Sequence, residues 1–423
     1  MPQLTEMLYL PQVSLAGPES AAVFGVLVAA LAMIGILGYV KSKFDNIAAW
    51  TSIAALLSGA SLTYTISTGY VDWVSILFGW ATLVALNEWL EKQDQRLLLL
   101  AGVFCGGALG TKYTAGVILI CSIFVLILMQ KPRSWKTIFS SVVLLGLAAT
   151  LASAPWWIKN FMGTGNPFYP FFIPSGAMDQ TRLRLYQSLP AWKDWRAVIF
   201  LPWQATFMGF DGKEGFAATV GPLLVGLGPL AVINSKLKEP HQKTTIGIAS
   251  IVAITGLLLW GIGSRFSGLL IQTRLYFAIF PALTILAGAG IHAIWNLSSL
   301  GVRFGRLTWM LAMFMFGLNV FGFCSGMVTS INPFSYLLQG EDRNSYLLRR
   351  LGGYMLAMQS VKTLPDHSQV LMLWEPKGYY CQPLCDSDEV LDRWSSDSSK
   401  YFDSPAVMHA WKDQGYSHIL IFN

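Results

Sequence analysis

The sequence predicts an α-helical polytopic membrane protein with about nine to ten transmembrane helices and a small C-terminal extracytoplasmic α/β domain. Of its 423 residues, 54% are hydrophobic and only 12% are charged. Because soluble domains carry about 25% charged residues, this composition indicates an integral membrane protein. Several apolar runs reach the roughly 20 residues that a helix needs to cross the hydrocarbon core, and no alternating pattern suggests a membrane barrel.

Residues 1–335 are expected to form the multi-span membrane domain. Leu97–Gly110 is short and rich in glycine, so it is the span that leaves the count open between nine and ten. The expected spans are Ala21–Val40, Ile47–Ser67, Trp73–Leu90, Leu97–Gly110, Thr114–Met129, Ile138–Ala154, Ala217–Ile233, Thr245–Gly263, Leu275–Trp295 and Trp309–Val328.

The basic residues predict how the chain is oriented. They gather in alternate short loops, for example at Lys41 and Lys43 and again at Arg303 and Arg306. Cytoplasmic loops of membrane proteins carry such an excess of lysine and arginine. The net charge of +6 therefore needs no nucleic-acid partner. We expect a multi-pass protein of the inner (plasma) membrane, with the long loop of about residues 155–215 and the C-terminal region outside the cell.

The start of the long loop is PWWIKNFMGTGNPFYPFF, residues 155–172. Pro155 is expected to end the preceding helix, and Gly and Asn-Pro indicate a turn after it. Its aromatic rings suit a membrane interface. One interpretation is an interfacial anchor; the other is the floor of a site for a lipid-linked anionic substrate. The candidate binding residues of this stretch are Trp157, Lys159, Asn160, Asn166 and Tyr169.

Residues 340–423 have a different composition. Eleven of the 23 acidic residues lie beyond Gly340. Helices are expected at Tyr346–Thr363 and Pro405–Gln414, and strands at Val370–Trp374 and His418–Phe422. In an oxidising compartment Cys381 and Cys385 are candidates for a disulfide.

Four ionisable residues near the outer membrane surface are functional candidates, because charges there are costly. Asp72 either caps a helix or faces a cavity, and Glu6 is either an ordinary loop residue or a second acidic group. Lys112 lies among glycines that permit close helix packing, but it also suits a phosphate. Arg274 offers a rigid fork for phosphate oxygens, although pairing with Asp72 or Glu6 is the structural alternative.

Several activities are disfavoured by missing motifs. The sequence has no phosphate-binding GKS or GKT loop, which argues against an ATP-driven pump. It has no GxSxG motif, and no histidine lies in the expected membrane-proximal outer loops, so a hydrolase is disfavoured. The five histidines are too scattered to predict a metal site.

Together these segments resemble the GT-C-type membrane glycosyltransferases, the superfamily of protein O-mannosyltransferases and aminoarabinose transferases. The matching segments are MPQLTEMLYL, YVDWVSILFGW, GGALGTKYTAG, APWWIKNFMGTGNPFYPF, GPLLVGLGPL and QTRLYFAIFPAL. The resemblance implies transfer of a sugar from a polyprenyl-phosphate carrier in the membrane to a lipid, glycan or protein acceptor. The C-terminal YMLAMQSVKTLPDHSQVLMLWEPKGYY is similar to the extracytoplasmic tail of some members.

The resemblance also implies roles for the candidate residues. Lys112, Lys159 and Arg274 would bind the carrier phosphate, while Glu6 and Asp72 would be acidic groups of the catalytic site. A divalent metal, Mg or Mn, is an optional cofactor of this chemistry. The first span and the catalytic aspartate loop of the family are not found before the matching segments. We therefore expect a fragment, and whether this chain alone is active stays open.

Two hypotheses from other classes compete with an enzyme. A transporter or flippase of a lipid-linked substrate should show paired broken helices in two related halves, and the sequence shows only one weak interruption, near Gly106–Thr111. A non-catalytic membrane scaffold predicts that Lys112, Lys159 and Arg274 do not converge on one cavity.

Overall fold

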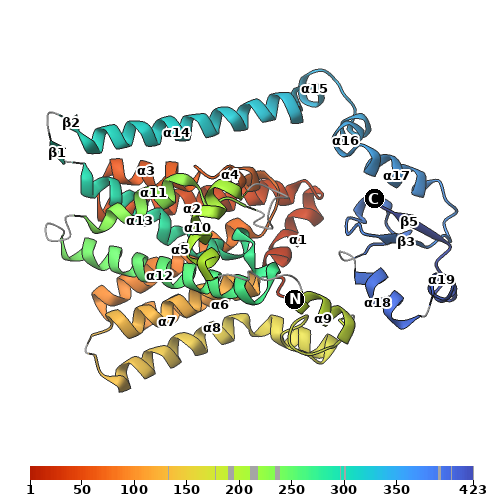
Figure 1. The fold of residues 1–423 in the computed structure, drawn as a ribbon, viewed down its shortest axis with the longest axis horizontal. Helices are drawn as coiled ribbons and strands as arrows, with labels where there is room; N and C mark the ends of the chain where they lie inside the picture. Colours follow the sequence, from red (N-terminus) through yellow and green to blue (C-terminus); the bar gives the residue numbers. More distant parts are fainter. Residues whose placement is uncertain are drawn as a thin grey trace. The chain divides into compact units, whose positions relative to one another are not determined.

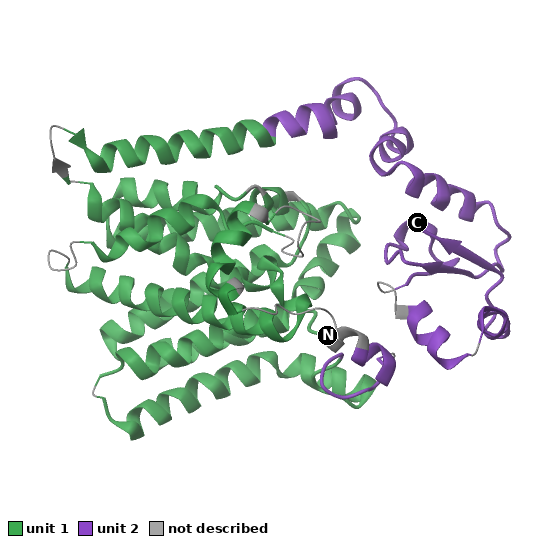
Figure 2. Ribbon diagram, in the orientation of Figure 1, with its two compact units in different colours: residues 1–169, 189–323 green, residues 170–188, 324–423 purple. Residues whose placement is uncertain are grey.

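The computed structural model divides the chain into two compact units (Figures 1 and 2). Unit 1 comprises Met1–Tyr169 and Leu189–Phe323, and unit 2 comprises Pro170–Ser188 and Cys324–Asn423. The structure describes all residues except 132, 177, 189–194, 210–217, 234–238, 296, 300–301, 389–391, 402 and 423.

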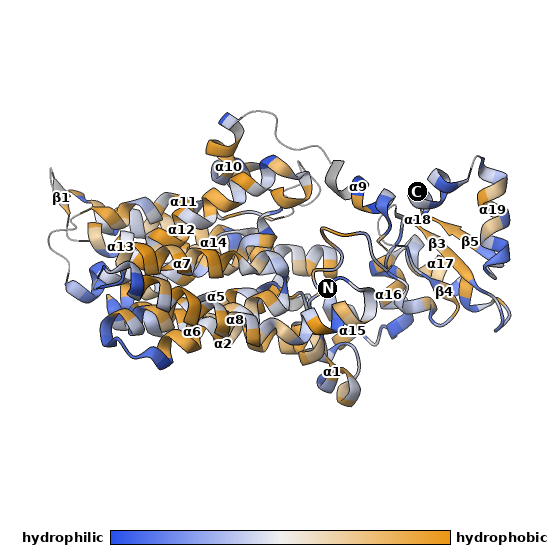
Figure 3. Ribbon diagram, turned by 90° about the horizontal axis from the view of Figure 1, so that it is seen from below, coloured by the Kyte–Doolittle hydropathy of each residue, from blue (hydrophilic) through white to orange (hydrophobic). Residues whose placement is uncertain are grey.

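Unit 1 is a bundle of mostly apolar helices (Figure 3). A short hairpin, β1 (Ser298–Ser299) with β2 (Val302–Arg303), precedes its last helix. The helices are α1 (Leu4–Ala16), α2 (Ser20–Lys43), α3 (Asn46–Leu56), α4 (Ala60–Tyr64), α5 (Asp72–Lys92), α6 (Gln95–Thr111), α7 (Val117–Met129), α8 (Trp135–Thr164), α10 (Trp195–Met208), α11 (Pro222–Leu227), α12 (Pro240–Phe266), α13 (Phe280–Ile294) and α14 (Phe304–Gly326).

The fold class predicted from the sequence is confirmed. Within the described residues, six helices are long and apolar enough to cross a membrane. The other apolar runs form shorter helices, such as α3, α6 and α11. The expected span Ile47–Ser67 is interrupted, because α3 ends at Leu56 and α4 begins at Ala60.

The expected helix end at Pro155 is wrong. Helix α8 continues through Pro155 to Thr164. Proline removes one backbone hydrogen bond, but neighbouring groups in a membrane protein often compensate for it. The helix ends instead at Gly165, whose φ of 74° is left-handed and suits glycine. The Gly165 N–H donates to the Phe161 carbonyl at 2.8 Å.

Three glycines of α6, spaced four residues apart, let this helix pack closely on α8. A Cβ on Gly106 would lie 2.4 Å from the Ala149 carbonyl oxygen, and one on Gly102 would lie 2.6 Å from the Ala148 Cβ. A Cβ on Gly110 would meet the Trp156 Nε1 at 2.6 Å. Such small residues permit helices to approach closely in a membrane. This seam holds the C-terminal half of α6 against the middle of α8.

Unit 2 is a small α/β unit around a parallel three-stranded sheet in the order β4–β3–β5. Its described elements are α9 (Gln180–Ser188), α15 (Pro333–Leu338), α16 (Arg343–Leu351), α17 (Gly353–Lys362), β3 (Val370–Leu373), β4 (Cys385–Asp386), α18 (Asp392–Lys400), α19 (Ser404–Asp413) and β5 (His418–Ile421). The single helix expected at Tyr346–Thr363 is two helices, because Gly352 adopts a left-handed φ of 53° between them.

The central strand β3 is buried on both faces. Met372 packs in one apolar cluster with Met358 of α17, and Leu371 packs in another with Trp411 of α19. Successive strand residues point to opposite faces, so the run Val370–Leu373 supplies both halves of the core. This explains why the strand is uniformly apolar.

Part of the long loop belongs to unit 2. Asp179, just before α9, accepts a hydrogen bond from Ser396 Oγ at 2.7 Å and forms an ion pair with Lys400 Nζ at 3.0 Å. Both partners lie on α18. Thr181 and Ser399 add a hydroxyl contact at 3.4 Å. Residues 170–188 therefore pack on the C-terminal region.

Candidate functional site

The strongest candidate site in unit 1 is a buried carboxylate held by two cations. Asp72 begins α5, and its residue is 1% exposed. Its Oδ1 accepts from Lys112 Nζ at 2.6 Å, and its Oδ2 lies 3.3 Å from Arg274 Nη2. Two positive charges and one negative charge leave this cluster with a net charge of +1. We call Asp72, Lys112 and Arg274 the charge cluster.

Three separate elements contribute to the charge cluster. Lys112 follows α6 in an extended conformation and precedes the 3-10 turn η2 (Tyr113–Gly116). Arg274 lies in the 3-10 turn η6 (Thr273–Ile279). Gly79 lets α5 contact η6 directly, because a Cβ there would lie 2.0 Å from the Ala278 carbonyl oxygen. A larger residue at this position would force α5 and η6 apart.

The two cations keep part of their surface accessible. The side chains of Lys112 and Arg274 are 21% and 28% exposed. The Arg274 guanidinium also lies over the Tyr70 ring, 4.6 Å from its centroid, an arrangement that stabilises a cation. Tyr9 of α1 donates its hydroxyl to the Tyr70 carbonyl at 3.3 Å. The cluster is thus anchored on α5 through Asp72 and covered in part by the Tyr70 ring.

The two asparagines predicted to bind substrate make hydrogen bonds within unit 1. Asn160 is buried, and its Nδ2 donates to Tyr113 Oη at 2.8 Å and to the Pro167 carbonyl at 3.2 Å. The buried Asn166 accepts at Oδ1 from the Phe168 N–H at 2.9 Å. Because Tyr113 directly follows Lys112, Asn160 connects the end of α8 to the chain beside the charge cluster.

The two aromatic candidates lie on α8 and on the turn that follows it. Trp157 belongs to α8, and its ring contacts the Phe168 ring at a centroid distance of 5.7 Å. The Tyr169 N–H donates to the Asn166 carbonyl at 3.2 Å. The turn after α8 thus packs back on the last part of the helix.

Two other sequence candidates take different positions. Lys159 Nζ donates to Gln3 Oε1 and to the Met1 carbonyl, the latter at 3.4 Å. Glu6 is exposed on α1. The structure thus brings Lys112 and Arg274 together on Asp72, while the described contacts of Lys159 are with residues before α1.

The helix-cap alternative for Asp72 is not what the contacts show. The N-cap position of α5 is Val71, and no side chain caps the helix by a hydrogen bond. The Asp72 carboxylate still lies in the first turn, where the helix dipole favours a negative charge. The structural alternative for Arg274, pairing with Asp72, is present.

The donor set does not fit a resident metal ion. Among the residues that the structure describes, no three His, Cys, Asp or Glu side chains come together. Asp72, the carboxylate of the charge cluster, is already committed to Lys112 and Arg274. We therefore assign no step to a metal. Cys381 and Cys385 form a disulfide, which lies in unit 2.

Sequence reasoning missed Tyr70, Tyr113 and Gly79. Tyr70 and Tyr113 each stand within two residues of a flagged charge, in GYVDW and TKYT, and that adjacency was the available signal. Gly79 carried no signal, because its importance depends on the distance to a turn almost 200 positions later.

Comparisons with known proteins now give these features a context. The family model described as dolichyl-phosphate-mannose-protein mannosyltransferase matches residues 13–158, which include Asp72 and Lys112. A comparison with curated proteins finds no match.

Two solved structures share the fold. One is ArnT from Cupriavidus metallidurans bound to undecaprenyl phosphate, with a TM-score of 0.54 and 14% sequence identity over 96% of this chain and 78% of that chain. The other is the same protein in the apo state, with a TM-score of 0.52 and 13% identity over 92% of this chain and 76% of that chain. At such identities the likeness concerns the fold.

The chain thus has the fold of a GT-C-type membrane glycosyltransferase, and the resemblance inferred from its sequence motifs is confirmed. The family model covers about a third of the chain, so the activity of the matching proteins is a proposal for this one.

Proposed function

We propose that this protein transfers a sugar from a polyprenyl-phosphate carrier to a lipid, glycan or protein acceptor on the outer face of the plasma membrane. The observation that carries the proposal is the charge cluster, in which buried Asp72 holds Lys112 and Arg274 together. Two converging and partly exposed cations suit a phosphate. The solved ArnT structure with undecaprenyl phosphate, which has the same fold, supports a carrier of this class.

The reaction would increase the negative charge on the carrier. An acceptor hydroxyl attacks the anomeric carbon of the sugar, and the bond from that carbon to the phosphate oxygen breaks. The hydroxyl proton passes to a base, and the carrier leaves as a phosphate monoester. Because the phosphate gains charge during this step, cations placed beside it stabilise the transition state more than the bound substrate.

The described residues suggest distinct roles in this reaction. Lys112 and Arg274 would bind the carrier phosphate, and Asp72 would position both cations. Glu6 is exposed on α1, and it remains the acidic candidate for accepting the proton. Lys159 would contribute positive charge near α1, where it contacts Gln3. Asn160 would hold the loop after α8 beside Lys112 through Tyr113.

Binding of the carrier lipid tests the proposal. The full chain in lipid nanodiscs is titrated with undecaprenyl phosphate, and undecaprenol serves as the uncharged comparison. We expect selective binding of the phosphate, weakened at least tenfold in Arg274→Gln, because a charge-assisted hydrogen bond is lost. Lys92→Met is the matched control, since Lys92 lies at the far end of α5 and pairs with Glu88.

Equal binding of undecaprenol and undecaprenyl phosphate would overturn the assignment, as would unchanged affinity in Arg274→Gln. A transporter or flippase of a lipid-linked substrate stays an alternative prediction. It is separated from an enzyme by reconstituting the protein in vesicles with a fluorescent polyprenyl phosphate. Movement of this lipid between leaflets without sugar transfer would favour the transporter.

A further inference from the structure

A strained tryptophan follows the central strand of unit 2. Trp374 has a φ of 68°, a left-handed conformation that is rare for a bulky residue. Its N–H donates to Asp388 Oδ2 at 3.3 Å, and its side chain remains partly exposed at 36% for the residue. Strain of this kind persists where the surroundings enforce it, often at a binding site.

Other aromatic side chains lie at the same edge of the sheet. Phe422, just after β5, donates its N–H to the carbonyl of Leu373, the residue before Trp374, at 3.3 Å. The Tyr354 ring contacts the Phe422 ring at 5.9 Å, and Tyr380 joins Tyr354 at 6.4 Å. Tyr379 packs against Tyr380 at 5.1 Å and is 62% exposed. We call Tyr354, Trp374, Tyr379, Tyr380 and Phe422 the edge aromatics.

The position of this edge in the sheet topology favours a ligand. The three strands are parallel, and β3 lies between β4 and β5. The chain therefore leaves β3 toward one side for β4 and later returns to its other side as β5. In open α/β sheets, ligands bind beyond the carboxyl ends of strands where the strand order reverses in this way.

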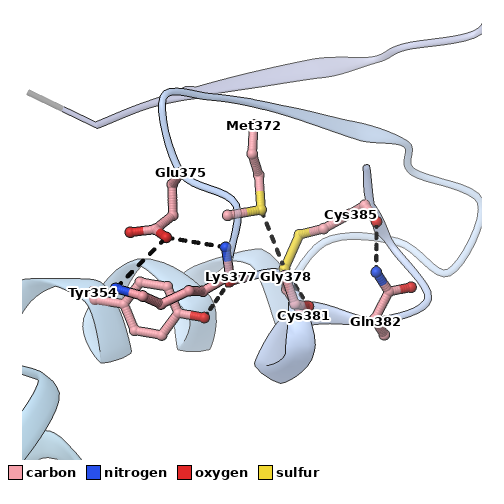
Figure 4. Close-up of a disulfide and its surroundings, with 8 residues drawn as sticks. All are labelled: Tyr354, Met372, Glu375, Lys377, Gly378, Cys381, Gln382 and Cys385. Carbon is pink, nitrogen blue, oxygen red and sulfur yellow. Dashed lines mark hydrogen bonds and ion pairs between the residues drawn. A yellow bond between two sulfur atoms is a disulfide. The ribbon is translucent and has the colours of Figure 1, made fainter. Parts of the chain in front are cut away.

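The loop after Trp374 is fixed by several contacts (Figure 4). The disulfide between Cys381 and Cys385 closes its far end. The Tyr354 hydroxyl donates to the Lys377 carbonyl, and the Lys377 N–H donates to Glu375 Oε1 at 3.0 Å. A loop already held in one conformation loses less entropy when a ligand binds.

The charges at this edge argue against a phosphate ligand. The charged side chains of the chain around Trp374 are Glu375, Lys377 and Asp388, with one negative charge in excess, and Lys377 Nζ lies 3.9 Å from Glu375 Oε1. The nearby Arg393 does not reverse this sign, because its Nε pairs with Asp397 Oδ2 at 2.7 Å. An anionic head group would be repelled, whereas the hydroxyl groups of a neutral ligand could donate to the carboxylates.

We propose that the edge aromatics and Glu375 form a binding site for a neutral saccharide. Sugars present apolar C–H faces that pack on exposed aromatic rings, and hydroxyl groups that donate to carboxylates. Tyr379 and Trp374 provide the exposed rings. Glu375 provides the acceptor through its other oxygen, Oε2, because Oε1 accepts from the Lys377 N–H. This site lies in unit 2 and uses none of the residues of the charge cluster, so it is independent of the carrier-phosphate proposal.

The test measures saccharide binding by the full chain in lipid nanodiscs. Titration calorimetry with maltotriose, cellotriose, mannotriose and chitotriose covers four neutral stereochemistries. We expect at least one to bind, and its affinity to fall at least tenfold in Trp374→Gly. Glycine tolerates the left-handed conformation, so the unfolding temperature of this variant should not fall. Met408→Ala, an exposed position on α19, should bind like the wild type.

The outcomes separate the proposal from its alternatives. Absence of binding by all four sugars overturns it, as does unchanged affinity in Trp374→Gly. If Trp374→Gly loses both affinity and thermal stability, Tyr379→Ala decides: weakened binding supports the site, and unchanged binding overturns it. Competition by inorganic phosphate would indicate an anion site and would also overturn it. Trp374→Gly should leave the binding of undecaprenyl phosphate unchanged, which distinguishes failure of this site from failure of the charge cluster.

Discussion

The buried Asp72 carboxylate has two effects on the charge cluster. It balances Lys112 and Arg274 so that both cations can lie close together, yet the cluster keeps a net positive charge for an anionic ligand. The sequence predicted all three residues as candidates, because charge near a membrane is costly. It offered the pairing of Arg274 with Asp72 only as one alternative, since the contact depends on how closely the η6 backbone approaches α5 at Gly79.

The coupling between Asp72 and Lys112 is testable by a double-mutant cycle. Lys112→Met leaves the Asp72 carboxylate buried with one partner, and breaking a buried pair costs about 3–5 kcal/mol. Asp72→Asn combined with Lys112→Met should recover part of this loss, because the buried carboxylate is gone and the remaining cation, Arg274, is partly exposed and lies over the Tyr70 ring. The unfolding temperature in detergent is measured for each single variant and for the double variant. An unfolding temperature of Lys112→Met equal to that of the wild type would contradict the pairing. Exposed Lys92→Met should unfold close to the wild-type temperature, because surface ion pairs contribute little to stability.

At the scale of elements, the apolar runs predicted where the helices lie, but one helix end was predicted wrongly from a proline. Pro155 predicted a helix end, and the structure continues α8 to Thr164. The local rule failed because α6 packs against this helix on both sides of the proline. Gly102 and Gly106 meet Ala148 and Ala149 before it, and Gly110 meets Trp156 after it. Helix α8 ends at Gly165, which adopts a left-handed φ.

The glycine seam between α6 and α8 predicts unequal effects of two Gly→Ala changes. Gly106→Ala places a Cβ 2.4 Å from the Ala149 carbonyl oxygen and should destabilise the protein by about 1–3 kcal/mol, as overpacking does. Gly146→Ala on α8 meets no atom within 4 Å, so it should be neutral or stabilising by less than about 1 kcal/mol. Thermal unfolding of the two variants in the same detergent compares them. Equal unfolding temperatures would show that the helices are not in close contact at Gly106.

At the scale of the whole molecule, the division into units follows contacts that no sequence pattern reveals. The α/β character of the C-terminal region was predictable from its short apolar strands and its shift in composition. That residues 170–188 pack with this region was not, because the docking depends on single polar contacts, such as Asp179 with Ser396 and Lys400. Polar contacts between distant segments leave no periodic trace in a sequence.

The docking of α9 should depend on pH through Asp179. Partial burial alone would raise the pKa of this carboxyl, but hydrogen bonds from the Arg182 N–H, Ser396 and Lys400 outweigh it and lower the pKa from 3.8 to about 2. A lowered pKa in the folded state means that the ionised form stabilises the docked state above about pH 4, and that this stabilisation is lost as the pH falls toward 2. Hydrogen–deuterium exchange of α9 should be faster in Asp179→Asn than in the wild type at pH 6.

The difference between wild type and Asp179→Asn should shrink at pH 3, where part of the wild-type carboxylate is protonated on opening. Comparing the two proteins at each pH removes the intrinsic effect of acid on exchange. A difference of the same size at pH 6 and pH 3 would show that the Asp179 charge does not hold α9 in place.

The orientation of the chain in the membrane follows from charge and can be tested by labelling. The loop between α7 and α8 carries Lys131 and Arg133, and Lys136 follows in the first turn of α8. We therefore expect this loop in the cytoplasm, with unit 2 outside. In a Cys324→Ser background, the described thiols that remain free, Cys105 and Cys121, are buried. A membrane-impermeant maleimide should then label Thr363→Cys on intact cells and Ser134→Cys only after lysis. The reverse pattern would place the charge cluster on the cytoplasmic side, where nucleotide sugars compete with a lipid-linked donor, and would remove the physical reason for a polyprenyl-phosphate carrier.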